Sequence, residues 1–145
     1  MEKIIQNIIS ILGDGFTEHF CESVLNRLTS FGYEVKEDDV WQLCFSVQKV
    51  KNHIMSSCNV TDIPDGLFHV AVDMVCGEFL FAKKQTNQLQ IEGLDLDGVI
   101  ASVSAGDTSV SFDNTASDEG KFNQLLNYLM TKGEGDFVCY RKLKW

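Results

Sequence analysis

The stretch from Leu67 to Phe81 constrains the fold most strongly, because it is apolar on almost every side. Pro64 stands just before it, where the first turn of a helix tolerates proline, so a helix is predicted. A helix that is apolar all round must be buried all round. A monomer of 145 residues has trouble covering every face of such a helix, so contact with a neighbouring subunit is expected. The residues assigned to this subunit contact are Phe68, Val72 and Phe79.

Other segments repeat apolar residues with the spacing of helices. They cover about 4–12, 16–31, 38–57 and 117–132. Ser117 is a good N-cap for the last of them, and the acidic residues at 118 and 119 suit a helix start. Together with the apolar helix, these segments predict a helical core over about 4–83 and 117–132.

The segment from about 85 to 113 loses the helical period and is expected to form a loop and a β-hairpin. Val99, Ala101 and Val103 alternate with other residues before a turn at Gly106 and Asp107, and the alternation resumes after it. An isolated hairpin is marginal in water, so this one should lean on the helices or pair with another chain.

The chain ends in an aromatic-rich stretch, 134–145, that is predicted to be an extended docking tail. Terminal segments are usually polar and poorly ordered, whereas this one carries five large apolar side chains. The fold class expected is therefore mainly α: one domain over 1–145, built as a bundle of four to five helices with a β-hairpin insertion and an extended C-terminal tail.

The formal net charge is -9 and the pI about 4.6, which argues against a protein that grips nucleic acid. No basic residue occurs between Lys84 and Lys121, whereas the chain closes with the basic and aromatic run Arg141–Trp145. No apolar run approaches the ~18 residues of a membrane span, and the N-terminus lacks a basic leader, so no secretory signal is expected. The five cysteines are odd in number and unpatterned, which suits reduced core thiols in a reducing compartment.

No catalytic motif is present, and the chain is expected to be no enzyme and to use no cofactor or metal. His69 and Asp73 are four residues apart and could form an acid–base or metal-binding pair, but a surface polar pair is the preferred interpretation because a third ligand is missing. Asp95 and Asp97 are interpreted as solvated loop residues, since they lack calcium-loop spacing.

The segment from Gly98 to Phe112 (GVIASVSAGDTSVSF), the proline turn into the apolar helix, and the closing YRKLKW resemble the head–tail connector, or adaptor, proteins of long-tailed bacteriophages. The similarity runs over about residues 37–145 and looks strongest to phages of Gram-positive hosts such as clostridia. It implies a virion protein, made in the host cytoplasm, that forms a neck ring of about twelve copies under the portal. DNA would pass through the ring during packaging and ejection without sequence-specific binding, and no membrane is involved.

The resemblance also assigns surfaces. The C-terminal tail would dock on the portal, through Phe137, Val138, Tyr140, Arg141, Lys142, Leu143, Lys144 and Trp145. The hairpin side would meet the next neck protein (a tail-completion or stopper protein) or the lumen, through Asp95, Asp97, Val103, Gly106, Asp107, Val110 and Phe112. A lumen lined by segments without basic residues would let DNA slide, because cationic contacts to phosphate are absent.

Two alternatives stay open. One keeps the phage setting and makes the chain another neck or tail-completion protein. The other is a small cytosolic enzyme or regulator whose site combines His69, Asp73 and an acidic loop.

Overall fold

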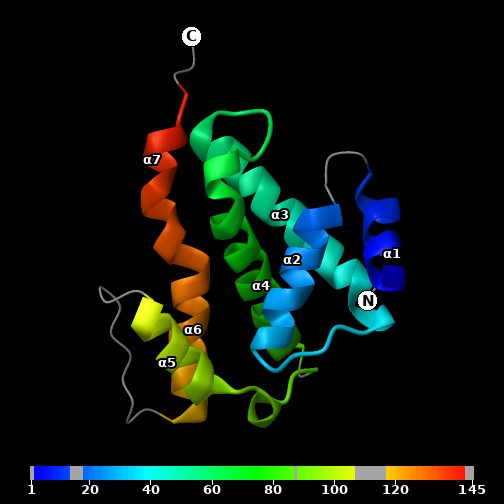
Figure 1. Cartoon of the computed structure of the whole chain (residues 1–145), viewed down its shortest axis with the longest axis vertical. Coiled ribbons are helices and arrows are strands. Elements are labelled where there is room, and N and C mark those ends of the chain that lie inside the picture. The colour runs from blue at the N-terminus through cyan, green and yellow to red at the C-terminus, as the bar shows by residue number, and fades with distance from the viewer. Residues whose placement is uncertain (1, 14–17, 87, 107–116, 143–145) are drawn as a thin grey trace.

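The computed structural model describes residues 2–13, 18–86, 88–106 and 117–142, most of which are helical (Figure 1). The α-helices are α1 (Glu2–Leu12), α2 (Glu18–Ser30), α3 (Val40–Cys58), α4 (Phe68–Gln85), α5 (Leu96–Gly106), α6 (Asp118–Thr131) and α7 (Phe137–Tyr140). Single turns of 3-10 helix lie at Glu37–Asp39, Asp65–Leu67, Ile91–Gly93 and Lys132–Asp136. The mainly-α prediction is confirmed.

Helix α4 lies at the centre of the bundle, with α2, α3 and α6 packed around it (Figure 1). Val72 is 4% exposed and Phe79 is fully buried, so neither side chain is available to a neighbouring subunit. Phe68 is half-buried and packs on the rings of His19 and Phe20 of α2. The prediction that Val72 and Phe79 form a subunit contact is therefore wrong, because α2, α3 and α6 pack around α4. Phe81, at the end of the apolar stretch, is 44% exposed, so the bundle leaves part of α4 uncovered.

Gly77 sets how closely α6 can approach α4. A Cβ atom on Gly77 would lie 3.1 Å from Cβ of Leu129 and nearer still to the Met130 side chain. Any larger side chain would push the two helices apart. Ser117 caps the start of α6 as predicted, since its hydroxyl accepts a hydrogen bond from the N–H of Gly120 at 3.2 Å.

The predicted β-hairpin is wrong in the part of the chain that the structure describes. Its first strand lies within α5, and 88–106 contains no strand. Leu96, Val99, Ile100 and Val103 recur at the spacing of one helix face, and all four are buried. The apolar residues of this segment fit both a strand and a helix, and the segment forms the helix because that places all four on one buried side. The predicted second strand, including Val110 and Phe112, lies outside the described residues.

The predicted extended tail, 134–145, is also wrong over 134–140, which belongs to the 3-10 helix Lys132–Asp136 and the short helix α7. Phe137 is only 3% exposed, because it packs into the bundle beside the ring of His53. Extended backbone begins at Arg141. Among the described residues, no helix has both the length and the apolarity that a membrane crossing requires.

Candidate interaction surface

Three large aromatic side chains remain exposed on α3 and α4, and we call them the aromatic face. Trp41 is 73% exposed, Phe45 is 68% exposed and Phe81 is 44% exposed. Trp41, Phe45, Lys49 and His53 follow one another at intervals of four residues, so they form a single ridge along α3. Burial of the opposite side of α3 leaves this ridge in solvent.

An ion pair fixes how the ridge lies against α4. Lys49 Nζ lies 3.1 Å from a carboxylate oxygen of Glu78. From this pair, Phe45 is one turn back along α3 and Phe81 is about one turn forward along α4. Because the two helices run in opposite directions, both rings lie toward the same end of the bundle. The exposed rings of Phe45 and Phe81 therefore lie at the same level of the two helices, one turn from the ion pair.

A small groove lies on the other side of this ion pair. Val50, Met74 and Met130 form its apolar lining, and its volume is about 240 Å³. His53 Nε2 and Glu134 Oε1, 3.0 Å apart, close one end of the groove. Methionine side chains adapt their shape readily, which suits a surface that receives side chains from a partner.

The C-terminal segment is fastened to the end of α3. The backbone N–H of Lys142 donates to the carbonyl oxygen of Cys58 at 2.7 Å, and Arg141 Nε donates to that of Ser57 at 3.0 Å. The Asn59 side chain donates in return to the carbonyl oxygen of Lys142 at 3.2 Å. Carbonyl groups at a helix end need such partners, so the end of the chain caps α3.

The predicted docking residues of the tail thus divide into two groups. Phe137 is a core residue, and Tyr140 is half-buried against Gly66, where a Cβ atom would collide with the phenol ring. Val138 is 67% exposed, and Arg141 and Lys142 are exposed as well. Leu143, Lys144 and Trp145 lie outside the described residues.

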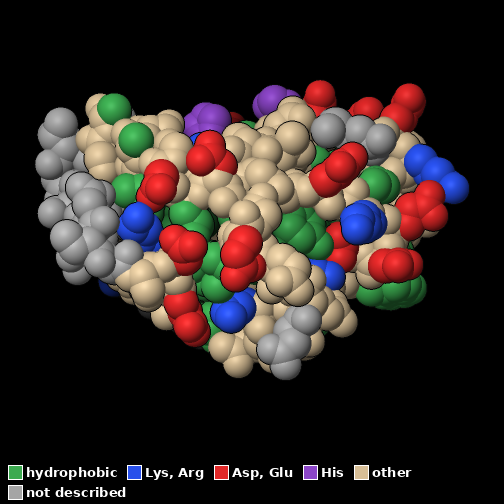
Figure 2. All heavy atoms as spheres, turned by 90° about the horizontal axis from the view of Figure 1, so that it is seen from below, with side chains coloured by type: hydrophobic (Ala, Val, Ile, Leu, Met, Phe, Trp, Pro, Cys, Tyr) green, Lys and Arg blue, Asp and Glu red, His purple; other side chains and the backbone are tan. Residues whose placement is uncertain are grey.

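The described part of the predicted hairpin side belongs to α5 and the segment before it, at the opposite end of the bundle from the C-terminus (Figure 1). Val110 and Phe112 lie outside the described residues. Asp95 accepts a hydrogen bond from the N–H of Gly98 at 3.2 Å, and Asp97 pairs with Lys121 at 2.8 Å. Val103 is buried, which excludes it from a surface contact, and Gly106 ends α5. Asp107 lies outside the described residues. Seen from this end, acidic side chains spread over the surface with Lys and Arg side chains among them (Figure 2).

A buried polar cluster joins the connector between α2 and α3 to the end of α4. The carboxylate of Asp39 accepts hydrogen bonds from Lys83 Nζ at 2.7 Å, Tyr33 Oη at 2.8 Å and the backbone N–H of Lys36 at 3.0 Å. Burial alone would raise the pKa of Asp39, but these donors outweigh it and hold the pKa below its usual range. Burial also raises the pKa of Tyr33.

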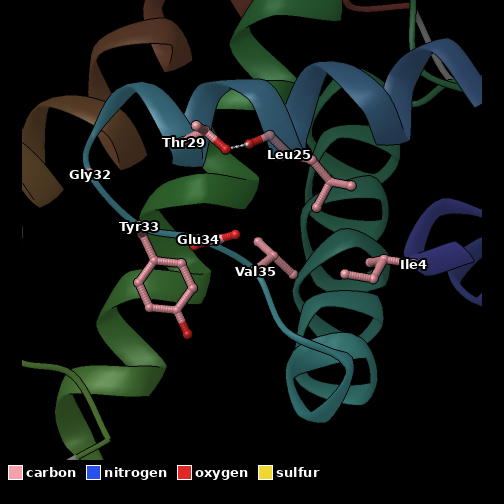
Figure 3. A pocket seen from close by; sticks show the side chains of 7 residues that line it. All are labelled: Ile4, Leu25, Thr29, Gly32, Tyr33, Glu34 and Val35. Carbon is pink, nitrogen blue, oxygen red and sulfur yellow. Dashed lines mark hydrogen bonds between the residues drawn. The ribbon is translucent and has the colours of Figure 1, made fainter. Parts of the chain in front are cut away.

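A hollow of about 400 Å³ lies beside this cluster, between α1, α2 and the segment 32–35 (Figure 3). Ile4 reaches toward it from α1 and Leu25 and Thr29 from α2, while Val35 and Glu34 belong to the connector. The Thr29 hydroxyl donates to the carbonyl oxygen of Leu25 at 2.9 Å, so this polar group is already satisfied by its own helix. The lining combines the apolar side chains of Ile4, Leu25 and Val35 with the polar groups of Tyr33 and Glu34.

His69 and Asp73 line a second hollow, of about 540 Å³, between α4 and the end of α6. The carboxylate of Asp73 is held by Arg27 Nε at 3.0 Å, and its pKa is nevertheless raised, because burial outweighs the nearby guanidinium. Within the described ranges, no group of three or more His, Cys, Asp or Glu side chains is placed to hold a metal ion. The sequence favours a surface polar pair of His69 and Asp73, whereas in the structure the Asp73 carboxylate pairs with Arg27 of α2.

Comparisons of the chain with protein-family models, with curated proteins and with solved structures find no match. The candidate interaction surface is therefore argued only from the residues of this chain.

Proposed function

We propose that the chain is a structural assembly subunit, and specifically a head–tail connector of a bacteriophage neck that associates with copies of itself and with the portal. The aromatic face carries the first part of this proposal. Exposed aromatic side chains that adjoin one another are typical of protein–protein interfaces and contribute most of the binding free energy there. Trp41 and Phe45 are more than two-thirds exposed, and a chain that worked alone would gain nothing from this.

The placement of charge supports an adaptor between two different partners. Helix α5 and the start of α6 form one end of the bundle. They belong to the segment between Lys84 and Lys121, which contains no basic residue. At the opposite end, where Figure 1 shows the C-terminal segment, Arg141 and Lys142 line a hollow together with Asp62 and Asp65. We assign this C-terminal end to the portal and the acidic end to the next neck protein or to the lumen of the ring. Lys121 lies at this end but pairs with Asp97, so an acidic lumen would offer DNA phosphates few cationic contacts and let the duplex slide.

The test mixes the purified chain with the portal protein encoded upstream of its gene and examines the product by native mass spectrometry and electron microscopy. The expected product is a ring of this chain seated on the portal. If the two proteins stay separate and no neighbouring gene encodes a portal or capsid protein, the connector proposal is wrong.

The portal-docking role of the C-terminal segment must be tested with a truncation that leaves the bundle intact. Deletion from residue 137 onward would remove Phe137 from the core, so its failure to bind would be uninformative. A chain that ends at Lys142 keeps both hydrogen bonds to α3. Lys142→Glu tests the charge, because Lys142 contacts α3 through its backbone, whereas Arg141 donates through its side chain. Both changes should abolish portal binding while the melting temperature stays within a few degrees. Unchanged binding by both would overturn the assignment of the tail.

A further inference from the structure

We propose that in the absence of other partners the aromatic face is covered by a second copy of the chain, in a twofold pair that sets α3 of each copy against α4 of the other. This inference rests on the assembly role proposed above and specifies the partner and the symmetry of the aromatic face. A twofold axis parallel to α3 and α4 brings the ridge of one copy against the exposed side of α4 in its partner.

The residues on this face complement themselves under that symmetry. Phe45 of each copy would meet the partner's Phe81, because both rings lie one turn from the Lys49–Glu78 pair and toward the same end. Lys49 would meet the partner's Glu78, and Glu78 the partner's Lys49. The Lys49 side chain is 56% exposed and that of Glu78 is 20% exposed, so both can reach across. Aromatic side chains thus meet aromatic side chains, and each cation meets an anion.

The twofold symmetry follows from the positions of the exposed residues on α3 and on α4. Exposed residues of α3 and of α4 sit side by side on one face, so a single twofold contact covers both rows in both copies. A ring contact is heterologous and needs its two complementary surfaces on different flanks of the subunit. The pair is therefore a closed form of the free protein, and ring assembly must separate it.

Charge exchange between copies tests this arrangement. Lys49→Glu and Glu78→Lys each break the ion pair within the chain and place like charges across the twofold contact. The dissociation constant of each variant alone should be about tenfold higher than that of the native chain, since close charge pairs across an interface contribute on that order. An equimolar mixture should regain association, because the carboxylate introduced at position 49 of one variant faces the ammonium introduced at position 78 of the other, while both internal pairs stay broken. Sedimentation equilibrium measures all four samples.

A matched pair of surface substitutions tests the aromatic contact. Phe45→Ser should weaken self-association by at least about tenfold, because buried aromatic residues dominate such interfaces. Val138→Ser removes a side chain of nearly the same exposure, 67% against 68%, from outside the aromatic face, and should leave association unchanged. Neither change removes a core contact, so melting temperatures should stay close to that of the native chain.

Three results would overturn the inference: a native chain that is monomeric at about 100 µM, a native chain that forms only larger rings, or a mixture of the charge variants that associates no better than each alone. A monomer that still forms a ring on the portal would leave the proposed function standing. A twofold pair that never binds the portal would support this inference and refute the connector proposal.

Discussion

Asp39 links the segment between α2 and α3 to the last turns of α4, which are far apart in the sequence. Its carboxylate holds Lys83 from the last turns of α4 and Tyr33 from the segment after α2, and Lys83 also donates to the side chain of Gln88 at 2.9 Å. The sequence places Asp39 at a helix start, where an acidic residue is favourable. Its burial could not be predicted, because Lys83 lies 44 positions away and is one lysine among several.

Replacement of Asp39 by Asn should lower the free energy of unfolding by about 3–5 kcal/mol at neutral pH, because Lys83 is then a buried charge without its counterion. The folded-state pKa of Asp39 is depressed, so its stabilisation is present above the unfolded value near ~3.9 and is lost as pH falls through the folded value. Stability of the native chain should therefore fall more steeply below about pH 5 than that of the variant.

Urea denaturation followed by circular dichroism measures both effects. Glu37→Gln is the control, because Glu37 pairs with Lys3 at the surface, and it should change stability by less than about 1 kcal/mol. Equal stability of Asp39→Asn and the native chain at neutral pH would contradict the expected role of the buried pair.

At the scale of elements, α1 to α4 and α6 follow from the sequence, because long segments with one apolar period leave little choice of structure. Helix α5 and the C-terminal turns did not follow. Val99 and Val103 fit both a strand and a helix, and only packing of Leu96 and Ile100 on the same side decides between them. In the short helix α7, the burial of Phe137 depends on His53 and Cys58, which are distant in sequence.

Two substitutions at Ser102, an exposed position in α5, test its helical state. Ser102→Ala should stabilise the chain by about 0.3–0.5 kcal/mol, because alanine is the better helix former. Ser102→Pro should destabilise α5 by about 3 kcal/mol and increase amide hydrogen exchange over 96–106, because proline removes a helical hydrogen bond. A proline variant with native exchange rates in this segment would show that α5 is not helical in solution.

Phe137 and Val138 provide a contrast within α7. Phe137→Ala should lower the free energy of unfolding by about 3–5 kcal/mol, since it empties a buried site, whereas Val138→Ala should change it by less than about 0.5 kcal/mol. Thermal or urea denaturation separates the two outcomes. If both variants unfold like the native chain, the C-terminal turn does not pack on the bundle.

At the scale of the whole molecule, one core runs through the described helices, from Ile5 in α1 to Phe137 in α7. The sequence predicted a buried α4 but not the helices that cover it, since no local pattern states which neighbours meet. The exposed aromatic residues escaped notice for a different reason. Residue type alone would assign Trp41 and Phe45 to the core, whereas the four-residue spacing that they share with Lys49 places them opposite the buried stripe of α3.

The single core gives a prediction for the five thiols. Cys21, Cys44, Cys58 and Cys76 are buried and Cys139 is exposed. Burial raises the pKa of the Cys44 thiol to about 11 and also raises the pKa of Cys76, which lowers their thiolate fraction at neutral pH. A thiol reagent should therefore label only Cys139 in the native chain, and the remaining cysteines should react together on unfolding. Mass spectrometry after timed labelling measures the extent of labelling at each cysteine. Rapid labelling of a second cysteine in the native chain would contradict a single core.

The fastening of the chain end to α3 determines how a mechanical load would travel. A pull on the C-terminus would reach Lys142 and Arg141 first, and their hydrogen bonds to Cys58 and Ser57 would pass the tension into the 19-residue α3. Phe137, seated just behind, would resist peeling of α7 from the bundle. The C-terminal segment is thus tied to the longest described helix, so tension applied at this segment is borne by the helical bundle as a whole.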